Sequence, residues 1–294
     1  MNKTGLQILI IFLTLLVFLM IGGFIYLLKS NFDWSNFGIS VGNTKLVESK
    51  EFASITEVNV ETKAIDVIVK ESENDSVVVE VYSNRDLDYS IKENEGKLNV
   101  YVNYTSKVTL FSFGNNTRVV IKLPKSYDGK FNVDAKVGDI IINSFENLEP
   151  TIKNSVGDLN IKDVKSVIVE ELGTGDIEID SAETVLIKKH STGDIKIDDV
   201  NTVMIRTNTG DIDVKNITNS FDIEGKTGDV KIDNADVKED SRIDHKTGDV
   251  RIKSLTGAYV ETTSKVGDVK VNNNDRYSEH TVTIKNNVGD VKVN

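Results

Sequence analysis

The chain contains no cysteine, which excludes disulfide bonds, thiol catalysis and thiolate metal sites. Only 2 of its 294 residues are proline, and aromatic residues make up 7%. Basic residues are also in deficit, because 35 lysines and arginines face 46 aspartates and glutamates, which gives a formal net charge of -11. Such a charge argues against nonspecific binding to nucleic acid or to anionic lipid headgroups. The content of apolar, β-branched residues is still too high for a disordered chain.

A short motif, Thr or Val followed by Gly-Asp and an apolar-x-apolar triplet, occurs nine times from residue 137 onward. Consecutive motif glycines are 17 to 22 residues apart, and a near-constant period of this length indicates a repeat architecture. All eighteen apolar triplet positions hold Ile, Val or Leu, so composition alone does not explain the pattern. The motif aspartates are Asp139, Asp158, Asp176, Asp194, Asp211, Asp229, Asp249, Asp268 and Asp290.

Each repeat also contains a second, weaker run of alternating apolar and polar residues, such as Phe221-Asp222-Ile223. Alternation is the period of a β-strand with one buried face. One repeat is therefore two short strands and two turns, which is too little chain for a core of its own. We predict an all-β fold, a parallel β-solenoid of about 18–19 residues per coil. The motif glycine lies where the chain turns into the first strand, and such a turn commonly needs a positive φ.

Residues Leu6 to Leu28 carry no charged side chain. At ~1.5 Å per residue, a helix of this length spans the ~30 Å hydrocarbon core of a bilayer. A cleaved signal peptide is the alternative, but its apolar core is normally shorter and is followed by a small-x-small cleavage site. The segment 29–34 offers no such site. We therefore predict that residues 1–28 form a cytoplasmic stub and a single transmembrane anchor.

The charges that flank this segment give only a slight positive-inside bias. A long β domain behind one N-terminal helix is nevertheless the usual layout of a signal anchor, which favours a cytoplasmic N-terminus and an extracytoplasmic β domain. Residues 29–45, rich in Ser, Asn and Gly, are typical of a juxtamembrane linker. We predict irregular opening β coils that cap the stack over 46–130, and the regular Gly-Asp solenoid over 131–294.

The nine motif aspartates are the only candidate site in the sequence. If the coils stack in register, these side chains form a column with a spacing of ~4.8 Å. Carboxylates this close repel one another, so we expect each to accept hydrogen bonds from turn backbone N–H groups. The alternative is a calcium ladder of the kind found in nonapeptide β-rolls. Each coil has one Gly-Asp rather than two, which favours the structural role, so we predict no metal site and no cofactor.

Other residues that could carry chemistry show no site pattern. His190, His245 and His280 occupy different repeat phases, and we expect all three at the surface. We expect the acidic pairs Glu170-Glu171 and Asp198-Asp199 to be solvated corners at turns. No nucleophile, zinc or phosphate-binding motif occurs, so we predict no enzyme activity. The alternative, a polysaccharide-acting β-helix enzyme, needs a groove built from long loops, whereas the repeat spacing never exceeds 22 residues.

The segment Val119 to Lys125 has the form Val-x-Ile-x-Leu-Pro-Lys, and Phe131-Asn132-Val133 leads into the serial Gly-Asp units. With an N-terminal anchor, these features resemble the bacterial "putative adhesin" β-strand-repeat family, a domain of unknown function. Its members include LiaG-like membrane-anchored proteins linked to cell-envelope stress operons. The resemblance covers residues 46–294. It implies a β-solenoid at the cell envelope without known catalysis, and it supplies no functional residues.

The function expected from these observations is that of a non-enzymatic, membrane-anchored module that presents flat β-faces to cell-wall or envelope proteins or polymers. A calcium-dependent adhesive rod is a further alternative, which depends on the aspartate column. We expect no nucleic-acid partner. We also expect a monomer, because Lys285 and Lys292 place charge on the last strands of the stack, and the polar segment 272–281 could fold over the exposed end.

Overall fold

Two units make up the described part of the chain. The computed structural model describes residues 39–41, 44–105, 111–113, 117–272 and 275–294. The predicted anchor, Leu6 to Leu28, lies outside these residues, and within them no helix is long and apolar enough to cross a membrane. The smaller unit contains β1 (Ile39–Val41), from the segment expected to be a linker, and β8 (Phe111–Phe113), which pair in parallel.

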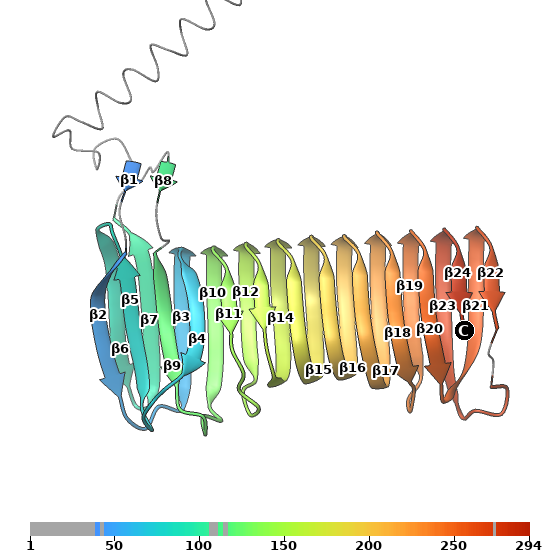
Figure 1. Ribbon diagram of the computed structural model, residues 1–294, viewed down its shortest axis with the longest axis horizontal. Helices are drawn as coiled ribbons and strands as arrows, with labels where there is room; N and C mark the ends of the chain where they lie inside the picture. Colours follow the sequence, from blue (N-terminus) through green and yellow to red (C-terminus); the bar gives the residue numbers. More distant parts are fainter. Residues whose placement is uncertain (1–38, 42–43, 106–110, 114–116, 273–274) are drawn as a thin grey trace, which may run out of the picture. The chain divides into compact units, whose positions relative to one another are not determined.

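The larger unit is a stack of coils in two layers (Figure 1). We call the strands that lead into the motif glycines the pre-glycine layer, and those that follow the motif aspartates the post-aspartate layer. The pre-glycine layer runs, in spatial order, through β6 (Leu87–Asn94), β7 (Lys97–Tyr104), β3 (Glu57–Ala64), β10 (Lys130–Val137), β12 (Pro150–Val156), β14 (Val164–Thr174), β15 (Ile177–Thr192), β16 (Ile195–Thr209), β17 (Ile212–Thr227), β19 (Ser241–Thr247), β23 (His280–Val288) and β21 (Ala258–Val266). The post-aspartate layer runs through β2 (Lys45–Phe52), β5 (Val77–Ser83), β9 (Arg118–Leu123), β4 (Asp66–Glu71), β11 (Ile140–Ile142), β13 (Leu159–Ile161), the first residues of β15, β16 and β17, then β18 (Val230–Asp236), β20 (Val250–Thr256), β24 (Val291–Val293) and β22 (Val269–Val271).

Equivalent residues of successive repeats face one another in parallel register. Ile177 pairs with Ile195, and Ile195 pairs with Ile212. This register follows from the period of the motif, because one residue of slip would turn every apolar side chain out of the core. The predicted all-β fold of stacked parallel strands is confirmed.

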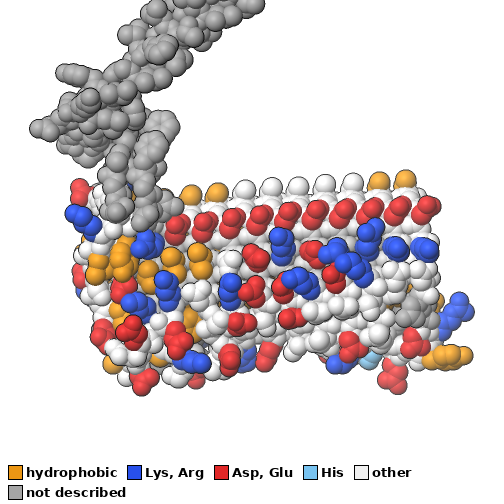
Figure 2. Space-filling model, viewed as in Figure 1, with side chains coloured by type: hydrophobic (Ala, Val, Ile, Leu, Met, Phe, Trp, Pro, Cys, Tyr) orange, Lys and Arg blue, Asp and Glu red, His pale blue; other side chains and the backbone are white. Residues whose placement is uncertain are grey.

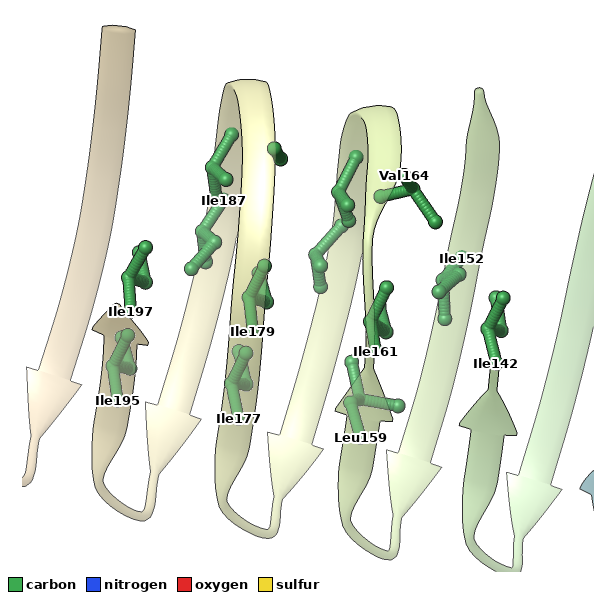
Figure 3. Close-up of a cluster of buried hydrophobic side chains, with 14 of the residues drawn as sticks. Ile142, Ile152, Leu159, Ile161, Val164, Ile177, Ile179, Ile187, Ile195 and Ile197 are labelled. Carbon is green, nitrogen blue, oxygen red and sulfur yellow. The ribbon is translucent and has the colours of Figure 1, made fainter. Parts of the chain in front are cut away.

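The apolar triplet residues point between the two layers, where they form one continuous core (Figure 3). Sixteen of the eighteen are buried. The exceptions are Val269, which is 45% exposed, and the half-buried Val271, because their coil has a neighbour on one side only. A third ladder of inward residues closes the cross-section between the layers, and it comprises Val164, Ala182, Val200, Ile217, Ala235 and Leu255.

Antiparallel strands close the N-terminal end of the stack. β6 pairs with β7 in one layer, and β2, β5 and β9 pair in the other. The parallel coil made of β3 and β4 lies inside this cap, between β7 and β10 in one layer and between β9 and β11 in the other. The outermost strands at this end, β6 and β2, pair antiparallel with their neighbours. Their sheet edges therefore differ from the parallel edge of a regular coil.

The last repeat of the chain is not the last coil of the stack. β24 lies between β20 and β22, and β23 lies between β19 and β21. The chain therefore passes from β20 to the terminal coil and then returns to fill the gap that it left. The expectation that Lys285 and Lys292 lie on the outermost strands is wrong, because the long spacing from Gly267 to Gly289 allows this return.

Candidate functional site: the glycine-aspartate edge

The motif glycines line one edge of the stack, where the chain crosses from the pre-glycine to the post-aspartate layer. All nine have φ between 126° and 145°, which L-residues rarely adopt. A Cβ atom on Gly193 would lie 2.1 Å from the carbonyl oxygen of Gly175 in the preceding coil. Glycine is therefore required here both by its backbone angle and by the close approach of neighbouring coils.

The motif aspartates form a hydrogen-bonded ladder beside these glycines. The Oδ1 atom of Asp176 accepts the backbone N–H of Asp194 at 2.8 Å, and Asp194 accepts that of Asp211 at 2.9 Å. The same bond, 2.7–2.9 Å long, links every neighbouring pair in the spatial order Asp139, Asp158, Asp176, Asp194, Asp211, Asp229, Asp249, Asp290 and Asp268. Each of these carboxylates except that of the terminal Asp268 thus accepts a backbone N–H from the next coil, rather than from its own turn as an Asx turn would require.

Asp66 is a tenth member of the ladder, because its Oδ1 atom accepts the N–H of Asp139 at 3.0 Å. An exact Gly-Asp match excludes it, since Ile65 occupies the position of the glycine, although the run Ile65 to Val69 is recognisable in the sequence as a degenerate copy of the repeat. The signal that identifies it is the following run Val67-Ile68-Val69, whose residues pair with Ile140-Ile141-Ile142. An exact match to Gly-Asp is therefore too strict a criterion.

The nine motif carboxylates are exposed to solvent, so the high dielectric constant of water weakens the repulsion between them. Within the described residues, no three His, Asp or Glu side chains come together in a way that could hold a metal ion. Calcium binding by the row Asp139, Asp158, Asp176, Asp194, Asp211, Asp229, Asp249, Asp268 and Asp290 stays an untested alternative.

A second row of side chains runs parallel to the aspartates, at the position before each glycine (Figure 2). Its middle consists of threonines and its ends of valines, of which Val137, Val156, Val288 and Val266 are 45–62% exposed. Neighbouring residues of this row are register partners, for example Thr192 and Thr209. The edge therefore presents two straight rows, one of β-branched side chains and one of carboxylates, separated by the backbone of the glycines.

Two of the three histidines are buried, which corrects the expectation that all lie at the surface. His190 is 1% exposed and His245 is 2% exposed, whereas His280 is partly exposed. Nε2 of His190 lies 2.9 Å from the carbonyl oxygen of Gly175, and its Nδ1 lies 3.0 Å from the hydroxyl of Thr207. Since a carbonyl oxygen only accepts, Nε2 carries a proton and donates it to Gly175, and in the neutral tautomer this leaves Nδ1 to accept the hydroxyl hydrogen of Thr207.

These histidines belong to an inward-facing column just before the edge, most of whose polar members donate to a glycine carbonyl. Asn154 donates to Gly138 at 2.9 Å, and Asn286 donates to Gly248 at the same distance. The glycine turn leaves this carbonyl inside the stack, where an unpaired acceptor would cost free energy. Gly225 takes the same position in its coil, and a Cβ atom there would lie 2.6 Å from Nδ1 of His245. Gly225 therefore makes room for the imidazole.

Charged side chains on the outer faces pair between neighbouring coils. The acidic pairs at 170–171 and 198–199 lie within the continuous strands β14 and β16, at points where the alternation of buried and exposed residues breaks, so that both members of each pair face outward. Glu170 bonds to Lys188 at 2.7 Å, and Asp198 bonds to Lys215 at 2.5 Å. Each exposed pair contributes at most about 1 kcal/mol.

Asp222 has the most extensive pairing, with Arg206 at 2.6 Å and Arg242 at 3.1 Å. Burial raises the pKa of Asp222, but the hydrogen bonds and charges of the two arginines outweigh it and hold this pKa below its ordinary value.

Solved structures with a similar course of the chain are known from several bacteria. A "putative adhesin" from Bacteroides fragilis is 13% identical, with a TM-score of 0.42, and the match covers 85% of this chain and 97% of that one. A "putative lipid binding protein" from Parabacteroides distasonis is 14% identical, with a TM-score of 0.38 and coverages of 86% and 98%. A "putative cell adhesion protein" from Clostridium sporogenes is 12% identical, with a TM-score of 0.25 and coverages of 85% and 98%. No curated protein matches the sequence.

The family model described as Toastrack DUF4097 matches residues 55–294. The matched region contains the whole aspartate ladder, from Asp66 to Asp290, and every strand of the two layers except β2. The resemblance to a family of β-strand repeats with unknown function is thereby confirmed. Since the match extends over most of the sequence, the chain belongs to the Toastrack DUF4097 family.

Proposed function

We propose that this chain is a non-enzymatic, membrane-anchored module whose β-solenoid binds partners in the cell envelope, outside the cytoplasmic membrane. The observation that supports this most is the regularity of the outer faces. Side chains at equivalent positions of successive coils bond to one another, so the surface repeats at the ~4.8 Å spacing of the strands. A rigid, repetitive surface is suited to an extended partner, such as a polymer, that itself repeats.

Ladders of polar side chains show this rigidity on more than one face. Asn234 donates to Asn216 at 2.8 Å, and Asn216 donates to Asp199 at 2.6 Å. Side chains that are already held in place lose little conformational freedom when a partner binds. The partners of the module are cell-wall polymers, envelope polymers or envelope proteins, and it acts as a monomer.

The location can be tested with single thiols, because the chain has no cysteine of its own. Thr192 is exposed on the edge of the stack, and Asn2 precedes the apolar segment. In intact cells, a membrane-impermeant maleimide should label Thr192→Cys but not Asn2→Cys, and both should react after lysis. Protection of Thr192→Cys in intact cells would contradict an extracytoplasmic domain.

Binding can be tested by co-sedimentation of the full-length chain, in detergent, with bacterial cell walls stripped of protein. We expect saturable binding that is lost when the chain is unfolded by urea, because the ladders exist only in the folded stack. Detergent extracts of envelope proteins, fixed on beads, test the second class of partner. A chain that remains in the supernatant with both materials would refute the proposal.

A further inference from the structure

A shallow groove of about 290 Å³ crosses the outer face of the pre-glycine layer near its antiparallel end. It runs over β7, β3, β10 and β12, at right angles to the strands. Asn59, Asn99 and Asn132 line one side, and Tyr101, Glu61 and Asp134 line the other. Short amides therefore face one aromatic ring and two carboxylates.

The three asparagines form a hydrogen-bonded amide ladder. They are register partners on β7, β3 and β10. Nδ2 of Asn132 donates to Oδ1 of Asn59 at 2.9 Å, and Nδ2 of Asn59 donates to Oδ1 of Asn99 at 3.2 Å. Asn59 also donates to Glu57 at 3.0 Å, and this bond, together with that of Lys97, lowers the pKa of the Glu57 carboxyl. The amides are thus fixed before any ligand arrives.

The ends of this ladder keep free hydrogen-bonding capacity. In the part of the chain that the structure describes, the amide N–H groups of Asn99 and the side-chain oxygen of Asn132 have no protein partner. One end therefore donates and the other accepts. Ligands with hydroxyl or acetamido groups both donate and accept hydrogen bonds, so they can bond to both ends of the amide ladder.

Tyr101 adds the second element of recognition. It projects from β7 beside Glu61 and is half-buried, so its ring is held in place but is reachable. An aromatic ring offers an apolar face to the C–H groups of a pyranose, while neighbouring amides and carboxylates bond to its hydroxyls. The asparagines repeat at about 4.8 Å, which is close to the length of one sugar residue in an extended β-linked chain.

The charges in the groove select between classes of glycan. The carboxylates of Glu61 and Asp134 disfavour a polyanion, and Lys153 is the one basic residue that lines the groove. We propose that the groove binds a neutral, β-linked oligosaccharide that carries hydroxyl or acetamido groups. This proposal rests on the proposed function, because it names the polymer class that the module recognises.

Isothermal titration calorimetry of the full-length chain tests it, in a detergent without a sugar headgroup. The probes are chitotetraose and cellotetraose, with tetragalacturonate as the anionic comparison. We expect saturable binding of at least one neutral probe and none of the anionic one. Tyr101→Ala should weaken this binding by at least about tenfold because ring packing is lost, and Asn99→Ala, which removes the free donor end of the amide ladder, should weaken it by about threefold or more, as expected for one or two lost hydrogen bonds.

Two control variants carry the same chemistry elsewhere. Tyr277→Ala removes a tyrosine that is 98% exposed outside the groove, and Asn216→Ala removes the middle of another amide ladder. Both should bind the probe like the unchanged chain, with all melting temperatures compared. The proposal is overturned if neither neutral probe binds, if tetragalacturonate binds more tightly, or if the groove variants bind like the controls. Cell walls that still co-sediment with Tyr101→Ala as with the unchanged chain would overturn the groove alone and leave the proposed function intact.

Discussion

Replacing Gly193 by alanine should destabilise the stack far more than a surface change of one methyl group normally does. Gly193 has a φ of 137°, and the new Cβ atom would lie 2.1 Å from the carbonyl oxygen of Gly175. Neither residue can move freely, because N–H of Gly193 bonds to Thr209 at 3.1 Å and the oxygen of Gly175 bonds to His190 at 2.9 Å. The strain therefore falls on the backbone, and a change of side-chain rotamer cannot relieve it.

The magnitude follows from three costs. A non-glycine residue at such an angle costs about 1–3 kcal/mol, and overpacking against a fixed neighbour costs about 1–3 kcal/mol. Displacing the carbonyl of Gly175 also weakens its bond to the buried His190, which contributes about 0.5–1.5 kcal/mol. We expect a total of about 3–6 kcal/mol. At about 2–4 °C per kcal/mol, that lowers the melting temperature by about 6–24 °C.

The assay is thermal unfolding of the full-length chain in detergent, followed by far-ultraviolet circular dichroism. Thr192→Ala is the matched control, since it changes the exposed neighbour of the same turn and should alter stability by no more than about 0.5 kcal/mol. A melting temperature of Gly193→Ala within two or three degrees of that control would refute the reasoning. It would mean that the edge yields to the added methyl group.

Three further outcomes are expected in the same assay. Asp194→Ala should cost about 1–3 kcal/mol, because the N–H of Asp211 loses a charged acceptor. Asp194→Asn should retain most of the stability through its amide oxygen, and an equal loss in both variants would exclude the ladder bond as the cause. Millimolar Ca²⁺ should change the melting temperature little relative to EDTA, since the ladder bonds need no metal; a large rise would support the calcium alternative. Deleting residues 272–294 removes β23 and β24 from within the stack, so this variant should be no more stable than one that lacks 258–294. A clear advantage of the shorter deletion would show that the terminal coil can pair directly with β19 and β20.

The period of the Gly-Asp motif alone was enough to predict the repeating part of the fold. Each repeat contains the residues that specify a strand, a turn and an inward face. The solenoid, the buried triplets and the row of aspartates therefore follow from local pattern and from pairing between like strands. The groove could not be predicted in this way, because Asn59, Asn99 and Asn132 become neighbours only when β7, β3 and β10 pair.

The tertiary structure decided what the repeats leave open. His190 and His245 are polar residues of a type expected at the surface, but their position before the edge faces inward. The turn glycines supply a carbonyl oxygen to which each imidazole donates a hydrogen bond. The order of coils was also decided there. Every repeat offers the same hydrogen-bonding edges. The sequence therefore predicts that each coil pairs with an equivalent coil, but it does not predict which coil that is. The longer connection before Gly289 lets the last repeat enter between two earlier ones, where it covers two sheet edges instead of one.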